Sequence, residues 1–384
     1  MYRELGNRER PTVVASVFGE EQNELRRVVR RFFEEKSSED EVRRLMETDD
    51  GYDRRVWTQM AGQLGLQGLA ISEQYGGSGF TQLEMSIVLE EMGRALVCAP
   101  VLSSAVLAAN LLLESGDEEA KTRLLPVIAD GSVIATVALA ESSGRWDGDG
   151  VATTAERDAT GWAVTGEKLF VLDGGTADVV LVVARTDRGL SLFEVSAGSS
   201  GLTVRPMDTM DRTRKQSTMV FSRTPARLIG AEGGAAIAVE RMLDLAAVAV
   251  AAEDVGGALR QVELAAEYAR TRSQFGKVIG SYQAIKQKLA DMLLSVELSK
   301  AAAYRVAQVA VDDPATLAVE AGMAKALCAE TYVQIAYDTI QIHGGIGFTW
   351  EHPAHLYFRR AKSNASLFGT PAHHRELVAQ RMGL

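Results

Sequence analysis

The residues with the clearest chemical potential in this 384-residue chain surround Arg272. A helical pattern ends with Arg270 and Arg272, is interrupted by the glycine-rich run 275–280 (FGKVIG), and resumes at Gln283. Such an interruption leaves backbone N–H groups without helical partners beside a planar guanidinium, and phosphate oxygens bind to both groups. The pattern favours a site for a phosphate-bearing ligand, although glycine also ends helices at ordinary corners between two helices.

Two later stretches add residues of the same kind. Residues 341–348 (QIHGGIGF) end a long helical pattern with glycines that bare the backbone. Residues 358–362 (FRRAK) bring two further arginines, and the run 367–370 (LFGT) follows them. All of these stretches lie in the C-terminal half of the chain, so the elements that carry them must bring them together.

The composition is that of a globular protein and argues against nucleic-acid binding. Apolar residues make up 46% and charged residues 24% of the chain, and its length predicts two or three domains. The formal net charge is −10, whereas a protein that binds a duplex needs a surplus of Lys and Arg. An anionic ligand must therefore be held by a local basic cluster.

The cysteines, histidines and apolar runs predict a cytoplasmic protein without a metal site. Cys98 and Cys328 do not form a disulfide framework, and the five histidines lack partners at ligand spacing. The N-terminus lacks the apolar core of a signal peptide. Residues 95–113 carry no charge, but Pro100 and several polar side chains favour a buried helix over a membrane span.

Changes in hydrophobic periodicity divide the chain into three regions. Residues 1–130 and 231–384 follow a helical period, whereas 131–230 contain short apolar runs separated by Gly, Asp, Ser and Thr. We predict an α+β fold with an N-terminal all-α domain, a central antiparallel β-barrel or sandwich domain, and a C-terminal four-helix bundle. The predicted bundle helices are 235–255, 257–270, 283–311 and 314–342, and the predicted strands are 133–139, 163–164, 169–172, 179–183, 190–195 and 219–221.

Taken together, these stretches resemble the acyl-CoA dehydrogenase family. Similar phrases occur earlier in the chain, at 65–69 (GLQGL), 75–77 (YGG), 166–168 (GEK) and 177–178 (AD), so the resemblance covers essentially the whole chain. It implies FAD as the cofactor, held partly across a subunit interface in a homotetramer or a mixed tetramer. It also implies an acyl-CoA substrate and electron-transfer flavoprotein, or a similar protein, as the electron acceptor.

The resemblance further implies which residues contact the cofactor. Arg272 matches a residue that faces the pyrophosphate, where a planar fork can bind two oxygens. The matches on the adenosine side are Gln274, Phe275, Ile279 and Gln283. The contacts expected from the partner subunit are Gln341, Gly344 and Gly345, and Thr370 matches another cofactor contact.

The family chemistry is α,β-desaturation of an acyl-CoA thioester. A carboxylate removes the proton α to the carbonyl, and the β-hydrogen leaves as hydride to the flavin. This sequence departs from that pattern at both usual positions of the base, which are Phe368 and Ala246 here. Two phrases that provide hydroxyl groups to the flavin in relatives also differ, at 140–142 (AES) and 170–172 (FVL), which leaves backbone amides as the alternative.

Two carboxylates on the first bundle helix are the remaining candidates for a catalytic base. Glu253 lies two turns from Ala246 on roughly the same face, and Asp244 lies on a different face. A Glu in so apolar a segment would have a raised pKa and could act as a base. We favour a structural role for Glu253 as the buried partner of Arg359 or Arg360, because two turns displace it by about 10 Å along the helix axis.

Several hypotheses about function remain open at this stage. The chain is an acyl-CoA dehydrogenase, a base-lacking subunit that shares its cofactor in a mixed tetramer, or a flavin-dependent monooxygenase on the same fold. A scaffold without flavin would leave Arg272 and the glycines at 344–345 unexplained. By resemblance, an acyl pocket lies near Leu172, Ala246, Ala247 and Phe368, and small Ala side chains suggest room for a bulky acyl chain. Arg212, Arg214 and Lys215 are either contacts of the CoA phosphates or part of an exposed loop.

Overall fold

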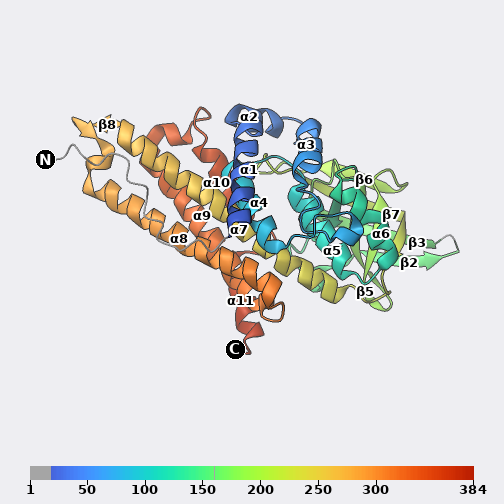
Figure 1. The fold of residues 1–384 in the computed structure, drawn as a ribbon. Helices are drawn as coiled ribbons and strands as arrows, with labels where there is room; N and C mark the ends of the chain where they lie inside the picture. Colours follow the sequence, from blue (N-terminus) through green and yellow to red (C-terminus); the bar gives the residue numbers. More distant parts are fainter. Residues whose placement is uncertain (1–18, 160) are drawn as a thin grey trace.

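The computed structural model describes residues 19–159 and 161–384 and places a β domain beside two helical regions (Figure 1). The N-terminal helices pack around one apolar core. Thr81 and Glu84 form a capping box that begins α4, and Gly65 ends α3 with a positive φ of 62°. The bounds are α1 (Glu20–Lys36), α2 (Glu39–Met46), α3 (Arg54–Leu64), η1 (Glu73–Tyr75), α4 (Gln82–Arg94), η2 (Val101–Ala108), α5 (Ala109–Glu114) and α6 (Glu118–Ala129).

The uncharged stretch 95–113 forms a buried helix, as predicted. It begins after Pro100 as the π-helical segment η2, in which every residue is buried, and continues into α5. Within residues 19–159 and 161–384, no helix is long and apolar enough to cross a membrane.

The β domain is a seven-stranded sheet with the order β1-β4-β2-β3-β7-β5, and β6 pairs with β7. Most pairings are antiparallel, but β1 runs parallel to β4, and β2 also meets β4 in parallel. The single strand β3 joins two runs that we predicted as separate strands, and β2 and β6 were not predicted because they are short and largely exposed. The bounds are β1 (Ala135–Ala138), η3 (Gly148–Gly150), β2 (Thr154–Asp158), β3 (Gly161–Leu172), β4 (Val179–Thr186), β5 (Gly189–Ser196), β6 (Leu202–Pro206) and β7 (Gln216–Ile229).

The C-terminal region is a helical bundle in which α7 passes through the centre (Figure 1). We predicted two helices on either side of Gly256, but α7 is one helix of 36 residues. Gly256 and Gly257 lie inside it because neighbours approach closely: an added Cβ would meet Glu90 O at Gly256 and the Tyr332 ring at Gly257. The bounds are α7 (Ala236–Thr271), β8 (Ser273–Gln274), β9 (Lys277–Val278), η4 (Ile279–Ser281), α8 (Gln283–Asp312), α9 (Leu317–His343), η5 (Gly344–Phe348), α10 (Ala354–Ser366) and α11 (Pro371–Arg381).

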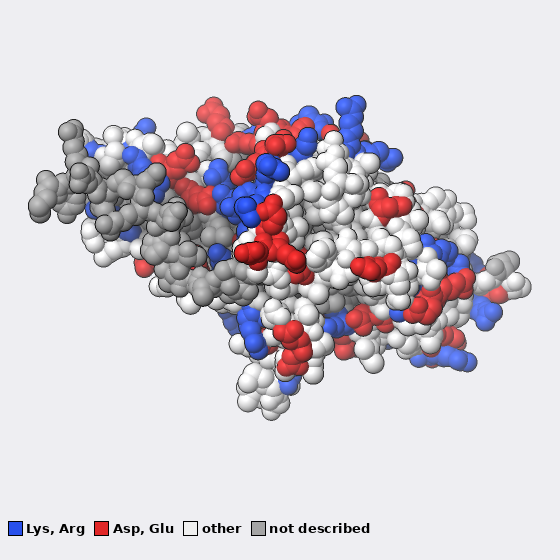
Figure 2. Space-filling view, viewed as in Figure 1, with Lys and Arg blue, Asp and Glu red and all other residues white. Residues whose placement is uncertain are grey.

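One hydrophobic core connects all three regions. It extends from Phe33 of α1 through Leu172 of β3 to Ala246 of α7 and Phe368 before α11. The predicted fold class is therefore confirmed, and the junction of the β domain with the bundle is a packed interior. On the surface, acidic and basic side chains are interspersed over the face shown in Figure 2.

Candidate functional site

The glycine-rich interruption after Arg272 is a two-stranded hairpin at the end of α7. β8 and β9 pair through Ser273–Val278 and Gln274–Lys277, and both turn residues have positive φ, 53° at Phe275 and 80° at Gly276. Two central residues with positive φ are typical of the tightest hairpins. The Tyr282 hydroxyl donates to Gln274 O at 3.0 Å, which fixes the hairpin against the start of α8.

The second corner, at Gly344 and Gly345, lies next to this hairpin. Tyr268, one turn before the end of α7, stacks on His343, the last residue of α9, with ring centroids 4.4 Å apart. Helix α9 ends at Gly344, which adopts φ 63° and ψ −140°, a backbone conformation that glycine adopts far more readily than other residues. The structure therefore brings both predicted corners to the same end of the bundle.

The residues expected to contact the cofactor are almost all accessible. Phe275 is 92% exposed, and Arg272 is exposed without an ion pair to any residue that the structure describes. A Cβ added at Gly344 or Gly345 would meet nothing within 4 Å. The other matched residues that are exposed are Gln274, Gln283, Gln341 and Thr370, whereas Ile279 is half-buried. Thr370 also caps α11 by accepting a hydrogen bond from His373 N. Their cofactor roles stay predictions.

The two positions where relatives carry the base are filled by apolar side chains. Ala246 is fully buried, and Phe368 is 4% exposed in the same core cluster. Phe368 packs edge-on against Trp146 at 5.1 Å between ring centroids, and Trp146 lies 6.4 Å from Phe170. We refer to Trp146, Phe170 and Phe368 as the aromatic cluster. Sequence reasoning missed Trp146, because it lies in a loop of Gly, Ser and Asp without periodicity.

Glu253 is held in a buried ionic network and is not available as a base. Its carboxylate accepts from Arg214 at 2.6 Å and from Arg360, whose Nε also donates to Asp211 at 2.8 Å. Burial alone would raise the pKa of Glu253, but Arg214 and Arg360 hold it below its ordinary value. The ion pair with Arg360 agrees with the structural role that we favoured, whereas Arg359 instead contacts Met210 O.

The remaining charged candidates also have internal partners. Asp244 pairs with Arg381 at 3.0 Å, and burial raises the pKa of Asp244 although Arg381 opposes the shift. Arg212 pairs with Glu47 at 2.7 Å, and Lys215 donates to Met46 O at 2.8 Å. Since Arg214 is also engaged, by Glu253, the hypothesis that this basic run meets CoA phosphates is not supported by the structure.

A small cavity lies beside the buried ionic network of Glu253. A cavity of about 20 Å³ lies between α4, the end of β3 and α7, which is enough for about one water molecule. Asp173, Arg214 and Glu253 line its polar side, and Asp173 accepts from Ser103 Oγ at 2.5 Å. Burial raises the pKa of Asp173. Ala246 and Phe368 are buried in one core cluster, and the idea that small Ala side chains make room for a bulky acyl chain stays a prediction.

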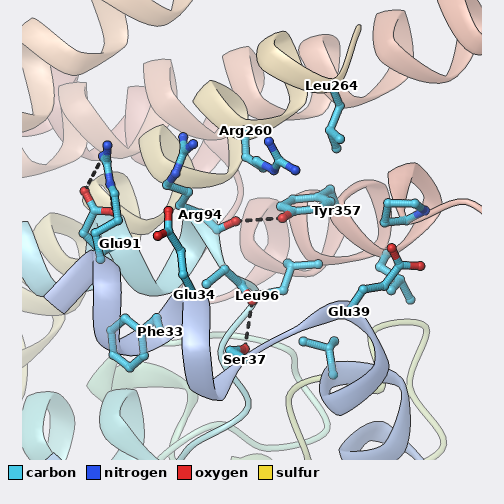
Figure 3. Close-up of a pocket in the computed structure, with 15 residues that line it drawn as sticks. Phe33, Glu34, Ser37, Glu39, Glu91, Arg94, Leu96, Arg260, Leu264 and Tyr357 are labelled. Atoms are coloured by element: carbon cyan, nitrogen blue, oxygen red, sulfur yellow. Dashed lines mark hydrogen bonds and ion pairs between the residues drawn. The ribbon is translucent and has the colours of Figure 1, made fainter. Parts of the chain in front are cut away.

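A larger cleft, of about 270 Å³, lies where α1, α4, α7 and α10 meet (Figure 3). Charged side chains project into it from several helices, and two of its arginines have carboxylate partners: Arg94 binds Glu263 through two hydrogen bonds, and Arg30 does the same with Glu91. The Tyr357 hydroxyl donates to Arg94 O at 2.7 Å. This cleft is below the usual size of ligand pockets, about 300–1,000 Å³.

A buried carboxyl group that sequence reasoning missed, that of Asp254, gives a pH-dependent stability. Asp254 Oδ1 accepts from Asn364 Nδ2 at 2.8 Å, and Lys325 Nζ donates to Asn364 O at 2.7 Å. Burial raises the pKa of Asp254 to about 7, although Lys325 opposes the shift. The folded state therefore keeps a proton on Asp254 up to about pH 7, whereas the unfolded chain loses it near pH 4. This carboxyl stabilises the fold at low pH, and the contribution is lost as the pH rises towards 7.

We expect Asp254→Asn to remove that pH dependence. The unfolding free energy of the wild type minus that of the variant should fall by roughly 1.4 kcal/mol per pH unit between pH 5 and 6.5 and become flat above pH 8. Urea unfolding at several pH values measures this difference, and groups that titrate in both proteins cancel. Parallel stability curves for the two proteins would contradict the assignment.

Comparison with known proteins identifies the family. Models of acyl-CoA dehydrogenase domains match in the expected order: the N-terminal domain at residues 19–132, the middle domain at 136–224 and the C-terminal domain at 232–383. The chain belongs to the acyl-CoA dehydrogenase family. The resemblance drawn from the sequence is thereby confirmed, and with it the expected class of oxidoreductases that act on CH–CH groups.

Individual acyl-CoA dehydrogenases match over nearly the whole chain. Acyl-CoA dehydrogenase IpdE2 of Mycolicibacterium smegmatis is 32% identical over 352 residues, 92% of this chain and 96% of the relative. Butyryl-CoA dehydrogenase from Megasphaera elsdenii has a TM-score of 0.89 at 26% identity, covering 97% of this chain and 100% of its own. A chain of the ChsE4–ChsE5 complex from Mycobacterium tuberculosis has a TM-score of 0.87 at 28% identity, covering 96% and 99%.

The residues present fit one part of FAD, the cofactor of this acyl-CoA dehydrogenase family, better than the other. The exposed arginine and open glycines fit a nucleotide with its pyrophosphate. On the flavin-ring side, both hydroxyls are missing, and one nearby amide has an internal partner, since Phe170 N–H donates to Met207 Sδ.

Proposed function

We propose that this chain is a subunit of a mixed, FAD-dependent acyl-CoA dehydrogenase in which a different chain supplies the catalytic base. The assembly carries out α,β-desaturation of an acyl-CoA thioester. The proposal rests on one observation: none of the four candidate positions provides a free carboxylate. Phe368 and Ala246 are buried and apolar, and the carboxylates of Glu253 and Asp244 are held in ion pairs.

The chemistry explains why these replacements matter. Removal of a proton α to a thioester needs a carboxylate within hydrogen-bond reach of that carbon, with a pKa raised towards the working pH. Glu253 has the opposite properties, because two guanidinium groups keep it ionised and occupy its oxygens. When bound, FAD would accept the β-hydrogen as hydride, but FAD cannot remove the α-proton in place of a base.

The surface of the bundle supports assembly with another chain. Large apolar side chains are exposed along α8 and α9, and a hollow of about 470 Å³ lies between α8, α9 and α11. Surfaces of this kind mark protein–protein contacts. The exposed residues are Leu293, Leu294, Leu298, Met323, Leu327 and Tyr337. The ChsE4–ChsE5 structure pairs two different chains, which supports a mixed assembly over a homotetramer. We include electron-transfer flavoprotein as the acceptor and the cytoplasm as the location in this proposal.

The test compares the chain alone with the chain co-expressed with a family member that has Glu at the position of Phe368 or Ala246. With FAD, a panel of acyl-CoA thioesters and a redox dye, we expect no turnover by the chain alone and turnover by the co-assembly. Glu→Gln at that position of the partner should lower turnover by about 10²–10⁴-fold, the range for loss of a general base.

Asp244→Asn in this chain is the matched control, because it removes a carboxylate from the same helix that the proposal does not use. It should leave turnover of the co-assembly unchanged. Dye reduction by the chain alone would instead make it a dehydrogenase with its own base. Oxygen consumption with reduced flavin, and no desaturation, would make it a monooxygenase.

A further inference from the structure

We propose that the cleft where α1, α4, α7 and α10 meet binds a small zwitterion with its two charges at opposite ends of a short apolar body, as in a short ω-amino carboxylate (Figure 3). The inference is independent of the proposed function, because the lining residues include none of the candidates for the base or for the cofactor contacts. At about 270 Å³ the cleft is smaller than the pockets of drug-sized ligands, so its occupant is a smaller molecule.

The floor of the cleft is apolar. It is lined by Phe33, Val42, Leu96 and Leu356, each of which is at most 3% exposed. These side chains come from α1, from α2, from the residues after α4 and from α10. A methylene chain that packs against them leaves water, and this stabilises binding in proportion to the apolar area that is buried. The floor therefore favours a ligand with an apolar middle.

The α7 side of the cleft offers a positive charge to a ligand. Arg94 binds both oxygens of Glu263, at 2.9 and 2.5 Å, whereas Arg260 reaches the same carboxylate only at 3.4 Å. Two guanidinium groups therefore share one carboxylate. Arg260 is 35% exposed and lies beside Tyr357, whose hydroxyl already donates to Arg94 O. Because its planar fork suits carboxylate oxygens, Arg260 is the group that would bind the anionic end of the ligand.

The side formed by α1 and α2 offers carboxylate oxygens. Glu34 lines the cleft and forms no side-chain hydrogen bond or ion pair with any residue that the structure describes. Glu39 accepts both hydrogen bonds from Arg43 on a single oxygen, Oε1, which leaves its second oxygen as an acceptor. Figure 3 shows both carboxylates at the border of the cleft, with Arg260 reaching in from α7. An ammonium group, with three donors and no acceptor, suits these oxygens.

The two sides together select a ligand that carries both charges. An anion alone is attracted by Arg260 but repelled by Glu34, and a cation alone meets the reverse. Arg30 does not change this balance, because Glu91 already binds it through two hydrogen bonds. Since the charged groups lie on different helices across an apolar floor, the ligand needs its charges at its two ends.

The closing experiment measures how the purified chain binds matched small probes, by calorimetry at fixed pH and salt. The test ligand is 6-aminohexanoate, which has a charge at each end of a methylene chain. Hexanoate lacks the ammonium group, hexylamine lacks the carboxylate, and L-leucine is an isomer of the test ligand with both charges at one end. We expect each of these three to bind at least about tenfold more weakly than 6-aminohexanoate, because each loses a charged contact.

Two substitutions assign the ends of the ligand to the two sides of the cleft. Glu34→Gln and Arg260→Gln each remove one charge from a partly exposed side chain, and each should weaken 6-aminohexanoate binding by about tenfold or more. Glu34→Gln should also narrow the difference between 6-aminohexanoate and hexanoate, and Arg260→Gln the difference from hexylamine. Glu35→Gln is the matched control, because it removes the same charge from the next residue of α1, which does not line the cleft. It should leave every dissociation constant unchanged.

Three results would overturn the inference. The first is the absence of saturable binding of 6-aminohexanoate up to about 10 mM, beyond which binding is too weak for a specific site. The second is equally tight binding of L-leucine, which would contradict the placement of the two charges at opposite ends. The third is binding that neither Glu34→Gln nor Arg260→Gln weakens, because the probe would then lie elsewhere on the protein.

Discussion

Glu253→Ala is expected to lower the free energy of unfolding by about 3–5 kcal/mol, the loss measured when one partner of a buried ion pair is removed. Glu253 is 3% exposed and neutralises both Arg214 and Arg360. Without it, two guanidinium groups stay buried, and Arg360 keeps its ion pair with Asp211 while Arg214 loses its carboxylate partner. The cost of burying these guanidinium groups is then uncompensated. This cost is larger than the side-chain entropy that is no longer lost on folding when Ala replaces Glu.

Equilibrium unfolding in guanidinium chloride measures this loss. Glu330→Ala is the matched control, because the Arg375–Glu330 pair has the same two-oxygen geometry but both side chains are at least half exposed. The control should cost less than about 1 kcal/mol. Equal effects of the two substitutions would show that the Glu253 network does not stabilise the fold through burial.

Gly256→Ala is the second large expected effect, a net loss of about 2–3 kcal/mol from overpacking. A Cβ at this position would lie 1.7 Å from Glu90 O and 3.0 Å from Arg94 N, both backbone atoms of α4. Backbone atoms inside a helix cannot move aside as a flexible side chain can, so α4 and α7 must separate. Ala gains about 1 kcal/mol of helix propensity over Gly, which the clash exceeds.

Gly62→Ala should change the stability of the same protein in the opposite direction. Gly62 lies within α3 on the surface, and an added Cβ would meet nothing within 4 Å. This substitution should therefore stabilise the protein by about 0.4–1 kcal/mol. Thermal unfolding of both variants distinguishes the clash with α4 at position 256 from the gain in helix propensity, which both substitutions share. A stable Gly256→Ala protein would mean that the two helices do not approach this closely.

Periodicity and glycine placement predict most of this fold. The amphipathic and Ala-rich runs identify α8 and α9 within a few residues, and short apolar runs bounded by turn residues identify β4 and β5. The same reasoning divides α7 at Gly256, because a glycine pair ends many helices. The sequence does not show which element packs against Gly256. Only the structure shows that α4 packs closely against α7 there and that glycine makes this approach possible.

The site was predictable at its glycine corners but not at its interior. Arg272 and Gly344 stand out because their chemistry is local, a guanidinium and a bare backbone. The Glu253–Arg214 pair joins residues 39 positions apart, and Trp146 meets Phe368 across the domain junction. Such contacts depend on the tertiary fold, so neither the buried ion pair nor the aromatic cluster could be derived from spacing.

The uninterrupted run of α7 has a consequence for how the protein can be divided. At 36 residues it extends about 54 Å and touches the N-terminal helices, the bundle and the hairpin at its end. A protease cut or a gene fusion within it would disconnect all of these at once. Exchange of modules between paralogous chains should therefore avoid breaks within residues 236–271, and limited proteolysis within this helix should release no stable fragment that contains only half of the bundle.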